Sequence, residues 1–212
     1  MNSDPYITEG IAEYVYTLFP ATFTGICVDV GAFDPFWNSN SWIFEKMGWD
    51  TYCIEPNPSC IPRLKQYRKN VLEYACGNKN LDDVDLFIFK VEGVGEAAGT
   101  GLIDHRILDE GHQKIFSKSV KVKERTLDWL MENEIKRDHI DYLSIDTERS
   151  EMDVILGTDL ARWKPKVIVI EHFEVDPDQS GYFKSKNYRY VYRIGFNDIY
   201  MLEDYYHHRV IY

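Results

Sequence analysis

Acidic side chains and one histidine follow two apolar, strand-like segments in the second half of the chain. Asp146 and Glu148 come directly after IDYLSI, and Glu171 and His172 come directly after PKVIVI. The carboxyl ends of neighbouring parallel strands meet at one rim of a sheet, so we expect these side chains to lie together. There, His172 or Asp146 could accept a proton from a substrate hydroxyl. Alternatively, Asp146 and Glu171 could bind a divalent cation, with His172 beside them.

A helix start offers a structural alternative for part of this group. The segment from Ser150 onward has a helical pattern, and a polar side chain at a helix N-terminus often serves as its cap. For Glu148 and Ser150 this interpretation stays open beside a functional one, whereas we interpret Asp146 and His172 as functional. Together with Glu148, these two residues form the candidate catalytic set.

Arg149 occupies what its neighbours indicate is a tight turn, where glycine would be comfortable. Its side chain could pair with Glu148 or Glu151. It could also reach into the site and bind an anionic group, so we take Arg149 as the candidate substrate-binding residue.

A second candidate site lies earlier, in CVDVGAFDPFWNSNS at residues 27–41. Asp29 stands in an apolar, strand-like run that ends at Gly31. A dinucleotide-binding turn needs the pattern G-x-G-x-x-G, but Phe33 and Asp34 occupy the following positions. The carboxylate of Asp34 would repel a phosphate and attract an ammonium or sulfonium group. This turn therefore favours S-adenosylmethionine, which carries both cations and no phosphate.

The ends of the next two strand-like segments support the same cofactor. Glu55 could accept hydrogen bonds from both hydroxyls of a ribose, or it could cap the Pro56–Asn57–Pro58 turn. A loop that contacts the base is expected at Cys76 and Gly77. The start of a helix at Asn40 and Ser41 could hold the methionine carboxylate. The candidate cofactor-binding residues are Asp29, Gly31, Phe33, Asp34, Asn40, Ser41, Glu55, Pro56, Cys76 and Gly77.

These sites need a scaffold that brings strand ends together, and the apolar pattern supplies one. Strands and helices alternate along most of the chain, which predicts an α/β fold with a parallel sheet and helices on its faces. The last two strands follow each other closely and predict an antiparallel hairpin. The predicted helices are 6–19, 39–48, 59–69, one from 127, and 150–160; the predicted strands are 25–31, 50–56, 71–77, 140–146, 165–173, 188–195 and 198–204.

Residues 78–125 interrupt this alternation. We interpret them as an insertion that contains strands at 83–89 and 119–126. The glycine-rich stretch between them, 92–104, is expected to be a mobile loop that serves as a lid, and an ordinary surface loop is the alternative. With no linker or repeat elsewhere, residues 1–212 are expected to form a single domain.

The motifs in VDVGAFDP, NSNSWIFEKMGWDTYCIEPNP and IDYLSIDTERSEMDVILG resemble those of the FkbM family of S-adenosylmethionine-dependent methyltransferases. The resemblance runs from about Cys27 to His172. It implies a Rossmann-like class I methyltransferase fold, with a seven-stranded, mostly parallel sheet whose last strand is antiparallel. It also implies O-methylation of a sugar or natural-product hydroxyl. The family usually has glycine where this chain has Arg149.

Composition narrows the class of partner. Asp and Glu outnumber Lys and Arg by 35 to 24, giving a formal charge of −11, which disfavours nucleic acid as a partner. The basic stretch 62–69 is interpreted as the solvated face of a helix. No apolar run is long enough to cross a bilayer, and the start of the chain does not resemble a signal peptide. Four cysteines without close pairing indicate reduced thiols, so we expect a cytoplasmic protein.

Three functions are therefore compared. The first is a methyltransferase that acts on a hydroxyl of a glycan or a natural-product-like small molecule. The second is a nucleotide-dependent oxidoreductase or sugar-modifying enzyme, which the missing glycines after Gly31 disfavour. The third is a non-catalytic binding protein with the same fold, which Arg149 suggests. The tail after residue 204 could form a homodimer interface or simply close the sheet.

Overall fold

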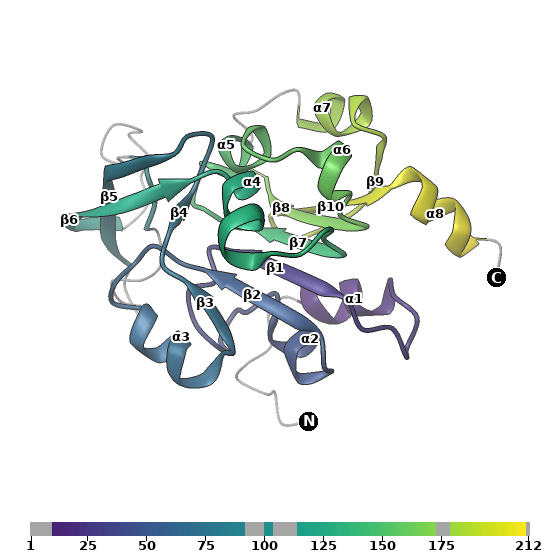
Figure 1. Cartoon of the computed structure of the whole chain (residues 1–212), viewed down its shortest axis with the longest axis horizontal. Helices are drawn as coiled ribbons and strands as arrows, with labels where there is room; N and C mark the ends of the chain where they lie inside the picture. The colour runs from purple at the N-terminus through teal and green to yellow at the C-terminus, as the bar shows by residue number, and fades with distance from the viewer. Residues whose placement is uncertain (1–9, 92–99, 104–113, 173–178, 211–212) are drawn as a thin grey trace.

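The structure is a computed structural model that describes residues 10–91, 100–103, 114–172 and 179–210. These residues form a seven-stranded sheet and a three-stranded sheet, shown in Figure 1. The strands of the large sheet are β1 (Ile26–Val30), β2 (Asp50–Ile54), β3 (Asn70–Leu72), β7 (Tyr142–Ile145), β8 (Val167–Glu171), β9 (Tyr188–Ile194) and β10 (Asn197–Leu202), and those of the small sheet are β4 (Ala75–Cys76), β5 (Leu81–Val91) and β6 (Lys114–Arg125). The helices are α1 (Ile11–Thr17), α2 (Trp42–Lys46), α3 (Ile61–Tyr67), α4 (Leu127–Leu130), the π-helix η2 (Met131–Ile135), α5 (Glu151–Leu156), α6 (Leu160–Trp163), α7 (Gln179–Ser185) and α8 (Glu203–Val210).

The large sheet has the order β3-β2-β1-β7-β8-β10-β9. Its first five strands in this order are parallel, whereas β10 is antiparallel to both β8 and β9. The predicted α/β class, the mostly parallel sheet and the antiparallel last strand are confirmed. The carboxyl ends of β1, β2, β7 and β8 therefore lie along one rim of the sheet.

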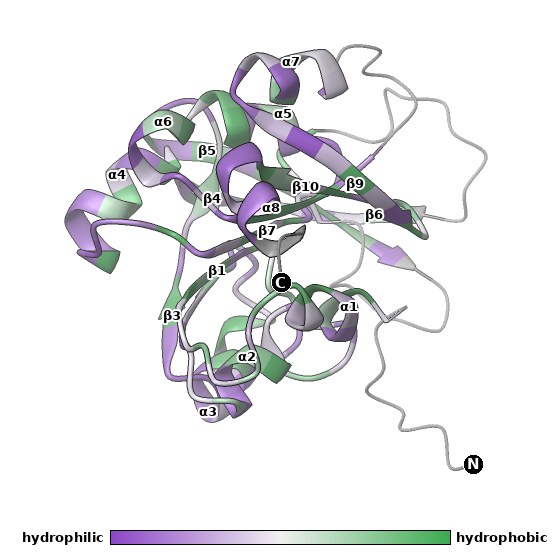
Figure 2. Cartoon of the chain, turned by 90° about the vertical axis from the view of Figure 1, so that its right-hand side faces the viewer, coloured by the Kyte–Doolittle hydropathy of each residue, from purple (hydrophilic) through white to green (hydrophobic). Residues whose placement is uncertain are grey.

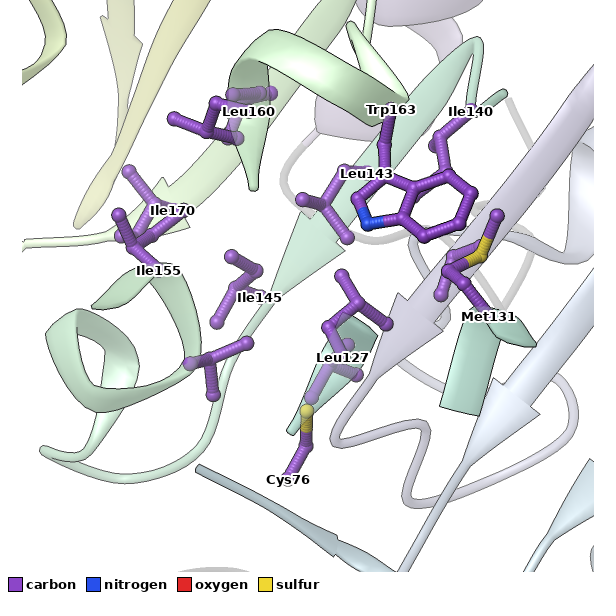
Figure 3. Packing of buried hydrophobic residues seen from close by; sticks show 14 of the residues in the cluster. Cys76, Leu127, Met131, Ile140, Leu143, Ile145, Ile155, Leu160, Trp163 and Ile170 are labelled. Carbon is purple, nitrogen blue, oxygen red and sulfur yellow. The ribbon is translucent and has the colours of Figure 1, made fainter. Parts of the chain in front are cut away.

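The central strands are apolar because helices cover both of their faces. Alternating side chains belong to different clusters, with Val28 in one and Cys27 in the other. The first cluster packs against α4 to α7, and Figure 3 shows Leu127 and Ile155 close to Ile145 within it. The second cluster packs against α1 and α2. Figure 2 shows hydrophobic residues concentrated in the central strands, with hydrophilic ones on α3, α4 and α7.

The predicted strand 71–77 is wrong as a single element. Its first part is β3, which pairs with β2 in the large sheet, and its second part is β4, which pairs with β6 in the small sheet. Glu73 and Tyr74 lie between the two, and exposed Glu73 pairs with Lys65 of α3. An apolar run predicts extended backbone but does not show which partner strand each half will pair with.

The insertion 78–125 forms most of the small sheet. The predicted strand 83–89 is confirmed as part of the longer β5, and the predicted strand 119–126 as part of β6 except for Thr126, which caps α4; β5 and β6 pair antiparallel. Most of the predicted lid, 92–104, lies outside the described residues. Its described part, residues 100–103, pairs with β5 through the main chains of Gly101 and Phe87, at 2.9 and 3.1 Å.

The last part of the chain packs against its beginning. The hairpin of β9 and β10 is confirmed, with an irregularity in register between Ile199 and Tyr200. Neither α7 nor α8 was predicted. In α8, the hydroxyl of Tyr205 donates to the carbonyl of Leu18 at 2.9 Å, and its ring lies beside Phe19. This contact fits the interpretation that the tail covers its own chain, and the homodimer stays a prediction.

Two predictions about the environment of the chain can be compared with the structure. Cys27, Cys53, Cys60 and Cys76 are all buried and none of them forms a disulfide, and their reduced state stays an expectation. Within the described ranges, no helix combines the length and the apolar character needed to span a bilayer.

Candidate active site

A pocket opens at the rim where the predicted strand ends meet. Its wall comes from the ends of β1, β2 and β7, from Cys76 of β4, from Leu86 of β5 and from residues 100–102 of the insertion. The carboxylates on the wall are Asp29, Glu55, Asp146 and Glu148, and the described residues that line it include no lysine, arginine or histidine. Such a pocket suits a cationic ligand, because a phosphate would meet four acidic groups and no counter-charge.

Gly31 lets the ends of β1 and β7 approach each other. Its φ of +85° lies in the left-handed region, and a Cβ built on it would lie 1.7 Å from the carbonyl oxygen of Asp146. At the same place, the main-chain N–H of Asp146 donates to the carbonyl oxygen of Val30 at 2.9 Å. This glycine is therefore needed for the close contact between two strand ends, whatever ligand the turn binds.

Glu55 is both a turn cap and part of the pocket wall. Its two carboxylate oxygens accept the main-chain N–H groups of Phe33, at 2.9 Å, and Asn57, at 2.8 Å. The side chain is only 5% exposed, and burial raises the pKa of Glu55 to about 7 despite these hydrogen bonds. The turn contacts predicted for Glu55 are therefore present, whereas its contact with a ribose stays a prediction, for which each oxygen keeps a lone pair.

Asp29 is part of the same pocket wall and is buried. Ser41 donates its hydroxyl proton to the Asp29 carboxylate, and the charge of Arg68 also favours the ionised form. Burial is nevertheless the larger effect, and it raises the pKa of Asp29 above its ordinary value. Ser41 itself is fully buried and does not line the pocket, whereas its neighbour Asn40 does.

Asp146 directly follows β7 and Glu171 ends the adjacent strand β8, and carboxylate oxygens of the two lie within 4.8 Å of each other. Burial raises the pKa of both groups, and the nearby Glu148 and Glu151 raise them further. The upward shift of the pKa is larger for Glu171 than for Asp146, so Glu171 is the member of the pair that keeps a proton to higher pH. Asp146 lines the pocket, whereas Glu171 is not part of its wall.

The acidic groups also bear on the predicted cation site. Oxygen atoms of Asp146, Glu151 and Glu171 lie within 4.8 Å of one another. Glu151 replaces His172 in this group. One oxygen of Glu151 already accepts the main-chain N–H groups of Thr147, at 2.8 Å, and Arg149, at 3.0 Å. A cation at this position stays a prediction.

The turn after β7 has the backbone that glycine would favour. Glu148 has φ +56° and Arg149 has φ +85°, both in the left-handed region. Ser150 is the N-cap position of α5, but its side chain makes no cap bond and its hydroxyl donates to the carbonyl of Thr147 at 3.3 Å. The cap interpretation of Glu148 stays open, and Glu151 accepts the N–H groups of the turn. Glu148 faces the pocket, whereas Arg149 is not part of its wall.

His172 lies outside the pocket wall. Its Nδ1 is 3.2 Å from the carboxylate of Asp198 and 3.2 Å from the side-chain oxygen of Gln179. Asp198 also accepts two hydrogen bonds from Arg193, at 2.7 and 2.8 Å. His172 therefore belongs to a polar cluster with α7 and β10, beside the rim rather than in the pocket.

The structure brings together most of the predicted cofactor residues but not all of them. Three are not part of the pocket wall: Ser41, whose hydroxyl donates to Asp29, and Asp34 and Gly77. Asp34 accepts the N–H groups of Phe36 and Trp37 in a local turn, at 2.9 and 2.8 Å, and pairs with Arg63. Gly77 packs against Gly157, whose built Cβ would lie 2.1 Å from the Gly77 carbonyl oxygen. The predicted cofactor residues that line the pocket are Asp29, Gly31, Phe33, Asn40, Glu55, Pro56 and Cys76.

Several wall residues were not predicted. Trp37 and Tyr74 contribute aromatic rings, and Thr100 and Leu102 come from the insertion. The side chain of Asn57 donates to Thr100 at 3.3 Å, which ties the insertion to the turn after β2. Trp37 directly precedes the polar run NSNS at residues 38–41, in the turn already predicted to bind the cofactor, and this placement was the signal in the sequence that could have identified it.

Comparison with known proteins places this geometry in context. The family model described as "Methyltransferase FkbM domain" matches residues 29–208. The crystal structure of methyltransferase FkbM from Methylobacillus flagellatus KT, at 2.20 Å resolution, matches with a TM-score of 0.51 and 15% sequence identity. The match covers 90% of this chain and 50% of that one, so this chain spans half the length of that protein and the likeness shows the fold. A comparison with curated proteins found no match.

Proposed function

Because this chain belongs to the FkbM methyltransferase family, we propose that it transfers a methyl group from S-adenosylmethionine to a hydroxyl of a glycan or natural-product-like small molecule. One observation carries the proposal: the pocket at the strand ends has four carboxylates and, among its described residues, no cationic side chain. S-adenosylmethionine carries two cationic groups and no phosphate, so it fits a pocket lined by carboxylates. The reaction would take place in the cytoplasm, in keeping with the four free thiols.

The chain's own residues would divide the binding between two ends of the pocket. Glu55, at the end of β2, would accept the ribose hydroxyls. Asp29 would face the amino group of the methionine portion. When bound, the cofactor supplies a methyl group on a positively charged sulfur, which is already reactive toward an oxygen nucleophile.

Asp146 is the residue that would handle the proton of the acceptor. It lines the pocket, and its raised pKa lies closer to neutral pH than that of an ordinary aspartate, which suits a general base. Glu171, with a carboxylate oxygen within 4.8 Å of Asp146, would hold the proton that the buried pair shares. Apart from this proton transfer, the protein would accelerate the reaction by holding the acceptor hydroxyl against the methyl group of the cofactor.

Calorimetry tests the cofactor directly. Wild-type protein is expected to bind S-adenosylmethionine and S-adenosylhomocysteine, and Glu55→Gln should weaken both about tenfold or more, because it removes hydrogen bonds to a charged group. Exposed Glu73, which pairs with Lys65 outside the pocket, supplies the matched control Glu73→Gln. Absence of binding by wild type would contradict the proposal.

A thermal-shift comparison separates the competing class of function. S-adenosylhomocysteine should raise the melting temperature, whereas NAD and NADP should not, because only a ligand that binds the folded state stabilises it. Transfer of a labelled methyl group to a panel of monosaccharides and their glycosides would then identify the acceptor. Stabilisation by NAD alone would favour an oxidoreductase.

A further inference from the structure

Arg68 is a buried cation beside the loop that leads from β1 to α2. Its side chain has 0% exposure, although the basic stretch 62–69 that contains it was interpreted as a solvated helix face. Its Nε donates to Glu45 at 2.7 Å and its Nη2 to the hydroxyl of Ser41 at 2.8 Å. Its Nη1 donates to the hydroxyl of Ser39 at 3.2 Å and the carbonyl of Pro35 at 3.3 Å.

A buried guanidinium is costly unless charges around it compensate. Glu45 supplies one negative charge, and its side chain is 5% exposed. The hydroxyls of Ser39 and Ser41 and the carbonyl of Pro35 accept hydrogen bonds from Arg68, but they contribute no negative charge. The remaining anion near Arg68 is Asp29, which Arg68 reaches through Ser41 rather than directly.

The hydroxyl of Ser41 links Arg68 to Asp29 through one hydrogen bond to each. Its oxygen accepts a hydrogen bond from Arg68, so its single hydroxyl proton is available to donate to Asp29. Replacing Ser41 would therefore remove a donor from Asp29 and an acceptor from Arg68 together. Ser39 also accepts from Arg68, but no contact between Ser39 and Asp29 is seen.

The three charges do not cancel. Asp29 and Glu45 carry two negative charges and Arg68 carries one positive charge, which leaves one negative charge in excess. Of the three residues, Asp29 is the one that lines the pocket. The excess charge is thus presented to whatever ligand the pocket holds.

We propose that Arg68, acting through Ser41, is a positioning residue that holds the Asp29 carboxylate so that it binds the ammonium group of an amino-acid ligand. The inference rests on the proposed function, since it identifies the part of the cofactor that Asp29 recognises. Neither Arg68 nor Ser41 lines the pocket.

The test compares two serines with two ligands. S-adenosylhomocysteine carries the ammonium group, whereas 5′-methylthioadenosine has the adenosine part without the amino acid. Ser41→Ala should weaken S-adenosylhomocysteine binding about tenfold and leave 5′-methylthioadenosine binding within about twofold, because only the first ligand uses Asp29. Ser39→Ala is the control: Ser39 accepts the N–H of Trp42 at the start of α2, so its loss should lower stability and leave both affinities within about twofold.

A double variant tests Arg68 itself. Arg68→Met with Glu45→Met removes the buried ion pair as a unit, which proteins tolerate better than loss of one partner. It should show the same selective loss for S-adenosylhomocysteine. If Ser41→Ala weakens both ligands equally, Ser41 only shapes the loop and the inference is wrong; if it weakens neither, Asp29 does not depend on this contact and the inference is also wrong. Failure of wild type to bind either ligand would instead contradict the proposed function.

Discussion

The main chain of Gly31 lies against the carbonyl oxygen of Asp146, so close that no side chain fits between them. This contact fixes the spacing between the ends of β1 and β7. It thereby fixes the distance between the turn that would hold the cofactor and the carboxylate that would act on the acceptor. Each of the following predictions changes one residue of this rim.

Gly31→Ala should destabilise the protein by about 2–5 kcal/mol, because it adds left-handed backbone strain to a direct clash with Asp146. Gly10 is a matched control. Its φ of +82° is nearly the same, but a Cβ built there has nothing within 4 Å, so Gly10→Ala should cost only about 1–2 kcal/mol. Urea unfolding measures both. Equal costs for the two variants would show that the clash is relieved by a small movement of β7.

Arg149→Gly should raise the free energy of unfolding by up to about 1 kcal/mol, because glycine adopts φ +85° without strain. Lys136→Gly, at an exposed position with φ +55°, is the control for relief of backbone strain alone. The Arg149→Gly variant also separates two interpretations of Arg149. A changed range of methylated sugars would indicate that Arg149 selects the acceptor, whereas inactivity of both proteins would favour a non-catalytic binding protein.

Glu55 should make stability depend on pH. Its pKa is about 7 in the folded protein and near 4.3 in an unfolded chain, so between these values the folded state holds a proton that the unfolded state has released. Its contribution is complete below about pH 4 and falls as pH rises through 7. Relative to Glu55→Gln, wild type should lose roughly 3 kcal/mol across this interval. Urea unfolding at several pH values measures the difference, and parallel curves would contradict the raised pKa.

Asp146→Asn should lower kcat by roughly 10²–10⁴, as expected for loss of a general base, with a smaller effect on KM for the acceptor. His172→Gln should lower it less than about tenfold, because His172 lies beside Asp198 rather than on the pocket wall. Methyl transfer to an acceptor from the sugar panel provides the assay. A larger loss for His172→Gln would return the role of base to the histidine.

The sequence predicted the strand ends well because each is a short apolar run followed at once by a polar residue. Glu55, Asp146 and Glu171 could be placed on one rim from that pattern alone. The glycine-like backbone expected at Arg149 is also present. These features depend on neighbours in the sequence, which a single chain displays directly.

Other features depend on contacts between distant segments and could not be predicted. Arg68 lies among basic residues that indicate an exposed helix, and only the fold shows that it is buried beside Ser41. Gly101 approaches the turn after β7, where its built Cβ would lie 3.1 Å from the carbonyl of Glu148. Asp34 has the charge expected of a cation-binding group, but it is used by its own turn. Whether residues 1–212 form a single domain, and whether they dimerise, stay predictions.

The irregular register between β9 and β10 has a consequence for solubility in concentrated solution. β9 is the outermost strand of the sheet, and its Tyr190 and Tyr192 are 48% and 57% exposed. A flat outer strand with such rings would offer another chain a place to add a strand and begin a fibril. An irregular register such as the one beside Ile199 increases the local twist of a strand, so a second chain would meet a twisted edge strand instead of a flat one.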